Sequence, residues 1–422
     1  MIRKSQDDVH AAGPENLGGM RVLVAMLGAR RAYLVPRALE RLGILELLFT
    51  DLAVVSARGA RGTPRSARWT TRLLGRRLIT GIPRRKVRQF PLLAARALVC
   101  RLARSPDARQ WAVWKSNQAF ARRVSAADWE RATAVYGFNS ACREVLETAA
   151  ARNLFRIVDQ ICVPWSVEEE ILAEERRVWR GWEPEPRREF WKRLADRERR
   201  EWELAHAIIC GSESVARSVA SAGGPADKCR VVPYGICRPV APAGERPRRE
   251  GGRLRVLFVG TVELRKGIQY LLDAVRQVGR QALDVRVVGP VRVSRRAAAE
   301  LARWVCLTGA LPRPAVDRQY AWADVLALPS LAEGSANVCF EALSAGLPVI
   351  TTRETGSVVR DGLEGFIVPA RNARAIAERL VRLQQAPEER RRMGRSARAR
   401  AGQFTEEAYC RALGRALARI EM

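Results

Sequence analysis

Two glutamates, Glu333 and Glu341, lie eight residues apart just after an apolar run. In a helix this spacing is slightly more than two turns, so the two carboxylates lie on a similar side at different depths. Such a pair can accept hydrogen bonds from two hydroxyl-bearing parts of one ligand. A nucleotide sugar has this form, with a diphosphate between its sugar and ribose hydroxyls. Taken alone, the spacing is more often explained by glutamates that only balance a helix dipole on a solvated face.

A pair of cations forms the second group of residues that can do chemistry. Arg265-Lys266-Gly267 follows the apolar run 254–260 and precedes the amphipathic run 268–275. Two adjacent cations between a strand and a helix can face a diphosphate, and the helix dipole adds to their effect. An exposed basic turn explains the pair equally well.

The elements expected around Glu333 place it at the edge of a sheet. Residues 323–328 are mostly apolar and predict a buried parallel strand. Residues 333–335 are expected to form a loop, and residues 336–345 a helix that Gly346 ends. A strand, loop and helix in this order place a helix N-terminus at the carboxyl edge of the sheet, where α/β folds bind anionic ligands.

The order of these pieces resembles glycosyltransferase family 4, also called glycosyltransferase group 1. The resemblance is strong over residues 254–415 and weak over 21–240. It implies an α/β fold of the GT-B type, with two Rossmann-like domains facing a cleft. Thr261 departs from the family, which often has an arginine there. The matching pieces are Gly260, Arg265-Lys266-Gly267, Gly309, Pro329-Ser330, Glu333-Gly334, Glu341, residues 345–350 and Thr355-Gly356.

The resemblance also implies a reaction and a role for each site residue. The reaction is transfer of a sugar, with retention, from a nucleotide sugar to a glycan or lipid-linked acceptor, in cell-surface polysaccharide or glycoconjugate synthesis. Glu333 is expected to orient the donor sugar, and Arg265 with Lys266 to neutralise the leaving diphosphate. The other expected contacts are Gly260, Gly334, Ser335, Glu341 (to the ribose), Thr355 and Gly356 on the donor side, and Gly28 on the acceptor side.

Residues that would hold a metal or a second cofactor are not apparent. No Asp-x-Asp motif and no C-x2-C pair occurs among the nine cysteines, so we expect reduced thiols, no metal, and no cofactor besides the nucleotide-sugar substrate. His10 lies in the N-terminal tail and His206 precedes a buried strand, so neither is expected to be catalytic. Asp159 ends a predicted strand and fits a capping role better than a site role.

The net charge of +29 suggests an anionic partner, or a genome rich in arginine codons, since only six of the 74 basic residues are lysines. The densest basic region, residues 65–104, is interleaved with apolar groups, as in surfaces that rest on lipid headgroups. No nucleic-acid-binding signature accompanies the charge, so a nucleic-acid partner is not expected. With no signal peptide or spanning segment apparent, we expect a cytoplasmic protein, peripheral on the inner face of the membrane.

The strand and helix signals predict two α/β halves. The charged segment 168–203 is expected to form helices with i,i+4 ion pairs, as a solvated face or a lid. Two other functions remain open: a noncatalytic scaffold with the same fold and, from charge alone, a nucleic-acid-binding protein. The predicted parts are a disordered tail (1–19), an N-terminal acceptor-side Rossmann-like domain (20–237), a linker (238–252), a C-terminal donor-nucleotide-binding domain (253–404) and a C-terminal helix crossing back to the first domain (405–422).

Overall fold

The described residues form two compact units. The first contains the described parts of residues 1–158, 204–207 and 406–422, and the second contains those of 159–203 and 208–405. The predicted domain boundaries at residues 237 and 253 stay predictions, and the tail to residue 16 and nearly all of the predicted linker lie outside the described residues. The computed structural model describes residues 17–55, 77–95, 106–185, 187–236, 239–240 and 252–420.

The first sheet is built from short strands that are rich in Val, Ile and Leu. All residues of its strand β1 are buried, which fits a parallel strand covered on both faces. The pairings of β1 with β2 and with β6 are parallel. The strand order is β5 (Val87–Gln89), β2 (Leu45–Thr50), β1 (Val22–Ala25), β6 (Ala134–Phe138), β7 (Phe155–Gln160), β8 (Ala207–Cys210) and β9 (Cys229–Val231).

The helices of the first unit include the last helix of the chain. Helix α15 packs against α1, where Arg37 and Glu406 form an ion pair of 2.9 Å. Helices α4 and α5 also pack together. These elements are α1 (Leu34–Arg41), α4 (Pro106–Ser125), α5 (Arg143–Ala151) and α15 (Glu406–Ala418), with a two-stranded sheet of β3 (Val54–Val55) and β4 (Leu78–Ile79) and the 3-10 helices η2 (Arg30–Tyr33) and η6 (Arg84–Lys86).

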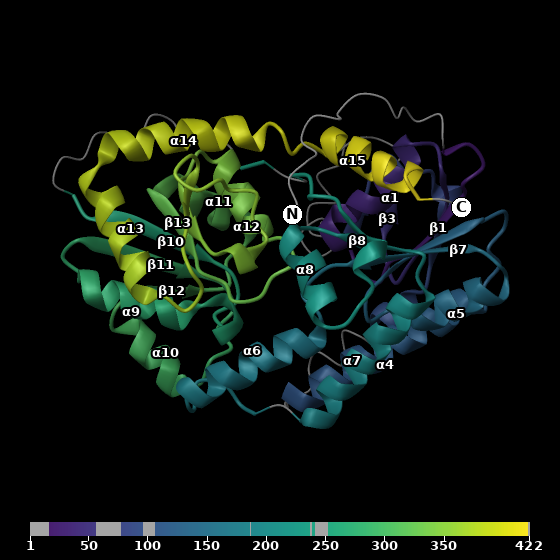
Figure 1. The fold of residues 1–422 in the computed structure, drawn as a ribbon, viewed down its shortest axis with the longest axis horizontal. Helices are drawn as coiled ribbons and strands as arrows, with labels where there is room; N and C mark the ends of the chain where they lie inside the picture. Colours follow the sequence, from purple (N-terminus) through teal and green to yellow (C-terminus); the bar gives the residue numbers. More distant parts are fainter. Residues whose placement is uncertain are drawn as a thin grey trace, which may run out of the picture. The chain divides into compact units, whose positions relative to one another are not determined.

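The second sheet (Figure 1) is parallel throughout, and the residues of the predicted site follow the carboxyl ends of its strands. Its central strand β10 pairs with β13 in the register Val256 to Val325. The carboxyl ends of parallel strands meet at one edge, so the loops after β10, β13 and β14 are neighbours. The strand order is β12 (Cys306–Gly309), β11 (Leu283–Val288), β10 (Leu254–Val259), β13 (Val325–Leu328), β14 (Val349–Thr351) and β15 (Gly365–Ile367).

Helices of the second unit pack against one another beside this sheet. Helix α9 packs against α13, and α12 packs against α14 (Figure 1). The helices are α6 (Trp165–Val178), α7 (Arg188–Leu204), α8 (Glu213–Ser221), α9 (Ile268–Val278), α10 (Arg295–Ala302), α11 (Arg313–Trp322), α12 (Asn337–Ser344), α13 (Ala373–Gln385) and α14 (Pro387–Ala401), with the 3-10 helices η7 (Ala226–Lys228), η8 (Leu264–Lys266) and η9 (Arg353–Thr355).

The elements predicted around the two glutamates are confirmed. The run 323–328 contains β13, the run 336–345 contains α12, and Gly346 follows that helix with a left-handed φ of 71°. The predicted α/β class with parallel sheets is also confirmed. Within the described ranges, no helix combines the length and the apolar character needed to cross a membrane.

The charged segment 168–203 forms helices α6 and α7 with exposed i,i+4 ion pairs such as Arg193 with Glu189, as predicted, but it also has a buried face that was not predicted. Glu168, Glu175 and Glu198 are buried although they stand in a highly charged sequence. The cause is the apolar residues between them: Leu172 and Trp191 belong to the hydrophobic core of the second unit and draw one face of each helix inward.

Candidate functional site

Three loops meet at the carboxyl edge of the second sheet because their backbones approach very closely. Gly267 has a φ of 70°, and a Cβ atom there would lie 1.9 Å from the carbonyl oxygen of Pro329. The amide of Leu331 donates to the Arg265 carbonyl at 2.8 Å, which joins the loop after β13 to the loop after β10. The Glu333 amide donates to the Glu354 carbonyl at 3.1 Å and thereby joins the loop after β14.

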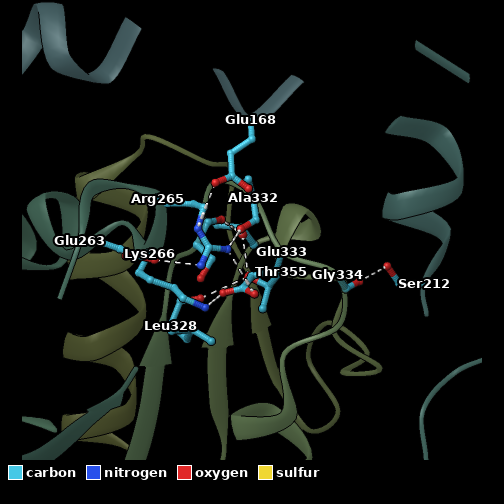
Figure 2. A network of polar contacts seen from close by, with 12 residues as sticks. Glu168, Ser212, Glu263, Arg265, Lys266, Leu328, Ala332, Glu333, Gly334 and Thr355 are labelled. Atoms are coloured by element: carbon cyan, nitrogen blue, oxygen red, sulfur yellow. Dashed lines mark hydrogen bonds and ion pairs between the residues drawn. The ribbon is translucent and has the colours of Figure 1, made fainter. Parts of the chain in front are cut away.

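The structure brings together the three residues predicted to be catalytic (Figure 2). Lys266 and Glu333 form an ion pair, and Arg265 Nη1 lies 3.5 Å from the second carboxylate oxygen of Glu333. Their side chains are 14%, 12% and 21% exposed in the order Lys266, Glu333, Arg265. The group is therefore largely shielded, and water weakens its electrostatic interactions less than on an open surface.

The guanidinium of Arg265 is held on all its edges by the protein. Nη2 lies 2.8 Å from Glu263, Nη1 donates to the Ala332 carbonyl at 2.9 Å, and Nε lies 3.7 Å from Glu168 (Figure 2). Burial alone would lower the pKa of Arg265, but the carboxylates of Glu168 and Glu263 outweigh it and raise that pKa above its ordinary value. Arg265 is thus a fixed positive charge in a defined orientation.

Lys266 differs from Arg265 in its proton affinity. Burial, together with the positive charge of Arg265, lowers the pKa of the Lys266 ammonium to about 7, and nearby carboxylates oppose this lowering. The ion pair with Glu333 acts in that opposing direction. Near neutral pH, the charge of this lysine therefore responds to any anion that enters the site.

Further charged groups surround the cation pair, and sequence reasoning did not find them. Glu168 comes from α6, and Glu183 accepts the Leu264 amide at 2.6 Å. Arg292 lies 3.6 Å from Glu263. Burial raises the pKa values of both Glu168 and Glu183. One signal could have identified α6: Glu168, Leu172 and Glu175 repeat at helical spacing and so share one face.

The loop after β13 is fixed at its glycine. A Cβ atom on Gly334 would lie 1.8 Å from the Ile161 carbonyl oxygen, so only glycine fits. The Ser212 hydroxyl donates to the Gly334 carbonyl at 2.5 Å (Figure 2), and a Cβ on Gly356 would lie 2.4 Å from that same carbonyl. Next to it, the buried Ser335 hydroxyl has no hydrogen-bond partner among the described residues and stands before α12.

Glu341 has partners of its own, distinct from those of Glu333. The Tyr320 hydroxyl donates to one Glu341 oxygen at 2.8 Å, and Arg313 Nη1 lies 2.8 Å from the other. Burial, with the Glu341 carboxylate adding to it, raises the pKa of Tyr320 well above its usual range, so this phenol stays protonated and donates. The carboxylate is held rigidly beside α11.

The remaining predicted residues are placed as follows. The Thr355 hydroxyl is buried and lies 3.3 Å from the Leu328 carbonyl, so it joins two loops (Figure 2). At Gly260 an added Cβ would meet nothing closer than 3.7 Å. Gly28 lies in the first unit after β1, where its amide donates to Asp51 at 3.0 Å.

Metal ligands and cavities do not point to a different site. Within the described ranges, no group of three or more His, Cys, Asp or Glu side chains could hold a metal ion. A hollow of about 630 Å³ lined by residues of α9, α13 and α14, among others, contains none of the predicted site residues. The loops at the sheet edge therefore remain the candidate site.

Comparison with known proteins gives matches in sequence and in fold. Residues 253–386 match the family described as Glycosyl transferases group 1. The D-inositol 3-phosphate glycosyltransferase of Segniliparus rotundus is 34% identical over 166 residues, covering 36% of this chain and 37% of that protein. The putative colanic acid biosynthesis glycosyltransferase WcaL of Escherichia coli is 30% identical over 147 residues, 31% of this chain and 36% of that protein. The chain thus spans less than half the length of either relative.

A likeness to solved structures extends over almost the whole chain. The structure of HepE from Anabaena, in complex with UDP and glucose, matches with a TM-score of 0.60 and 15% identity. The match covers 94% of this chain and 99% of that chain. This likeness confirms the predicted GT-B fold.

Proposed function

Because residues 253–386 belong to the glycosyl transferases group 1 family, we propose that the protein is a retaining glycosyltransferase. It moves a sugar from a nucleotide-sugar donor to a glycan or lipid-linked acceptor, in cell-surface polysaccharide or glycoconjugate synthesis. The observation that carries this proposal is the gathering of Arg265, Lys266 and Glu333 at the carboxyl edge of the second sheet. The crystal structure of HepE contains UDP and glucose, which supports the same class of donor here.

The cation pair binds the donor diphosphate and neutralises it as it leaves. When the bond between the anomeric carbon and the diphosphate oxygen breaks, both electrons stay on that oxygen. Arg265 stays positively charged near neutral pH. Lys266 has a pKa of about 7, and a bound anion favours its charged form. Preorganised charges of this kind act most strongly where charge develops in the transition state. The acceptor oxygen forms the new bond to the anomeric carbon, and its proton passes to the leaving diphosphate oxygen.

Glu333 must exchange partners for a phosphate oxygen to reach Lys266. In the structure its carboxylate covers the ammonium as an ion pair. When the diphosphate takes that position, the freed carboxylate can accept hydrogen bonds from hydroxyls of the donor sugar. Glu333 therefore pairs with Lys266 in the absence of the diphosphate, and it orients the sugar once the diphosphate is bound.

Glu341 and Ser335 bind the other parts of the donor. The Glu341 carboxylate, held by Tyr320 and Arg313, accepts hydrogen bonds from the ribose hydroxyls. The buried Ser335 hydroxyl stands before the N-terminus of α12, where a phosphate oxygen is favoured by the helix dipole. We propose that these groups and the two cations serve in place of a metal ion.

A membrane-facing surface is proposed for the basic region 65–104. Its residues 65–76 and 96–104 lie outside the described residues. In the described part, Arg84 and Arg85 are exposed and Leu92 is 80% exposed. Exposed cations and an exposed apolar side chain in one region of the sequence suit an anionic lipid surface, and they support the proposal that the protein is peripheral on the inner face of the cell membrane.

The experiment that tests the proposed function is turnover of a panel of nucleotide sugars by purified protein. We expect one donor to be consumed and the anomeric configuration of the product, read by NMR, to match that of the donor. Binding of a donor without turnover, with every class of acceptor supplied, would favour the noncatalytic scaffold. A product of opposite configuration would contradict retention.

A further inference from the structure

Helix α6 presents one face to the loop that carries the cation pair. Glu168, Leu172 and Glu175 lie on this face, and Leu172 belongs to the hydrophobic core. Two turns beyond Glu168, Glu175 accepts from Gln269 at 2.8 Å and from the Tyr270 hydroxyl at 2.9 Å, which fixes α6 against α9. The backbone of Glu168 is therefore held in place independently of its own side chain.

Glu168 supplies a contact to Arg265 that the loops at the sheet edge do not supply. Its carboxylate lies 3.7 Å from Arg265 Nε, whereas Glu263 and Ala332 engage the two Nη atoms (Figure 2). Contacts on three edges from three segments fix the plane of a guanidinium. Removing the Nε contact leaves only the contacts to the two Nη atoms, from Glu263, Ala332 and Glu333, and the Nε edge of the guanidinium is then unsupported.

We propose that Glu168 is a positioning residue of the diphosphate site: it fixes the orientation of Arg265 from α6, and it takes up a proton when the diphosphate binds. The inference rests on the proposed function, because it assumes that a donor diphosphate occupies the Arg265 and Lys266 pair. A protonated Glu168 still turns a carbonyl oxygen toward Arg265 Nε, 3.7 Å away, so an attractive contact survives the protonation.

The charges around the pair explain why a proton is needed. Four carboxylates face four cations, so the unliganded group is close to neutral. A diphosphate ester brings two further negative charges into this shielded space. The groups are, by segment, Glu168 and Arg176 on α6, Glu183 after α6, Glu263, Arg265 and Lys266 after β10, Arg292 after β11 and Glu333 after β13, with the thiols Cys162 and Cys339 nearby.

Glu168 is the carboxyl group that accepts this proton most readily. Burial raises its pKa, and an added anion raises it further. Glu183 is half-buried, which raises its pKa, but its hydrogen bond from the Leu264 amide favours the ionised form. Glu263 is closer to Arg265 than Glu168 is, with an ion pair of 2.8 Å. Glu168 has the longer 3.7 Å ion pair with Arg265, and the positive charges of Arg265, Lys266 and Arg176 lower its pKa less than burial raises it.

The test is calorimetric binding of nucleotide sugars, without acceptor, to Glu168→Gln, Glu168→Ala and wild-type protein. UDP-glucose, GDP-mannose, ADP-glucose and dTDP-glucose serve as probes, because their diphosphate esters lack the phosphate ionisation near pH 6 that free diphosphates have. Titrations in two buffers of different ionisation enthalpy count the protons taken up. At about pH 6, Lys266 with its pKa of about 7 is already charged, so uptake reports on carboxyl groups.

Wild-type protein should take up protons at about pH 6, and Glu168→Gln should lose this uptake while keeping its affinity within about threefold. Glu168→Ala alone should weaken binding about tenfold. In protein that already carries Arg265→Ala, adding Glu168→Ala should weaken binding no further. Glu170→Gln, at an exposed position of α6, should match wild-type protein in affinity and uptake. Melting curves establish that each variant is folded. If Glu168→Ala does not fold, the proton uptake of Glu168→Gln tests the inference by itself.

Full proton uptake by Glu168→Gln, or wild-type affinity in Glu168→Ala, would overturn the inference and leave the proposed function standing. Failure of wild-type protein to bind any of the nucleotide sugars would overturn the proposed function, and the inference with it.

Discussion

At the scale of single residues, Lys266 shows how position sets chemistry. An exposed lysine stays charged throughout the physiological range, with a pKa of about 10.4. Burial beside Arg265 lowers the pKa of Lys266 to about 7. Its charge therefore depends on what occupies the site, whereas Arg265 stays charged throughout. The two adjacent cations of the sequence have different roles.

We expect nucleotide-sugar affinity to fall as pH rises above about 7. A bound diphosphate favours charged Lys266 and raises its pKa, so the bound state holds a proton that the free state loses above its pKa of about 7. Affinity should weaken by up to about tenfold per pH unit above neutrality, measured by calorimetry. Lys266→Arg keeps a positive charge at all these pH values, so its nucleotide-sugar affinity should depend less on pH. An unchanged slope in Lys266→Arg would assign the effect to another group.

Glu341→Ala should weaken donor binding by about 1.5–3 kcal/mol, because a charge-assisted hydrogen bond to the ligand is lost. The change also leaves the buried Tyr320 hydroxyl without its 2.8 Å acceptor, so a lower melting temperature is expected as well. Tyr320→Phe is the matched variant, since it removes the hydroxyl and keeps the carboxylate and Arg313. Equal affinity losses in the two variants would mean that the packing, not the carboxylate, matters to the ligand.

At the scale of elements, the site is made by loops whose backbones touch. Gly267 sits against Pro329, and Gly334 sits against Ile161, at separations that no Cβ atom permits. These contacts hold Arg265 and Glu333 within ion-pair distance although their strands are separated along the chain. The position of the site therefore depends on two glycines that have no chemistry of their own.

Gly334→Ala should destabilise the fold by about 1–3 kcal/mol, because the new methyl group must displace the backbone at Ile161. Gly402→Ala is the control, since its added Cβ would lie at an ordinary 3.4 Å from Ala399. Denaturant unfolding of both variants measures the difference. A Gly334→Ala protein as stable as the control would show that this close approach relaxes at no cost.

The sequence predicted the strand and helix around Glu333 because apolar runs, a glycine stop and parallel-strand geometry are local signals. Parallel-strand geometry also predicted that Arg265, Lys266 and Glu333 lie at one edge of the sheet. It did not find Glu168, because the contact of α6 with Arg265 depends on packing between distant segments. The charged composition of residues 168–203 also concealed the buried face that Leu172 and Trp191 create. Which Glu341 oxygen meets Arg313 and which meets Tyr320 likewise follows only from the packing of α11.

At the scale of the whole molecule, the net charge of +29 is the dominant property. In the described structure many arginines are engaged in ion pairs, such as Arg88 with Glu130 and Arg382 with Glu389. Arg84 and Arg85 instead point out of a 3-10 helix and are exposed. The excess charge is therefore partly available to an external anionic surface.

Binding to vesicles containing anionic lipid should weaken in the double variant Arg84→Gln with Arg85→Gln. Each cation near such a surface contributes about 1 kcal/mol, so the pair accounts for roughly a thirtyfold change at low salt. Arg391→Gln with Arg392→Gln on α14 is the charge-matched control and should bind like wild-type protein. Sedimentation with neutral and anionic vesicles measures the effect. Equal recovery with both kinds of vesicle would favour codon usage as the origin of the charge.

The central claim is that Arg265 and Lys266 neutralise the leaving diphosphate, and its most direct test is the turnover number with the preferred nucleotide sugar in the presence of a chelator. We expect wild-type turnover to survive chelation, because the two cations take the part of a metal. Arg265→Ala with Lys266→Ala should lower kcat by at least about a hundredfold in folded protein, since both act on charge that grows as the bond breaks. Turnover lost on chelation and restored by magnesium or manganese, or full turnover in the double variant, would contradict the claim.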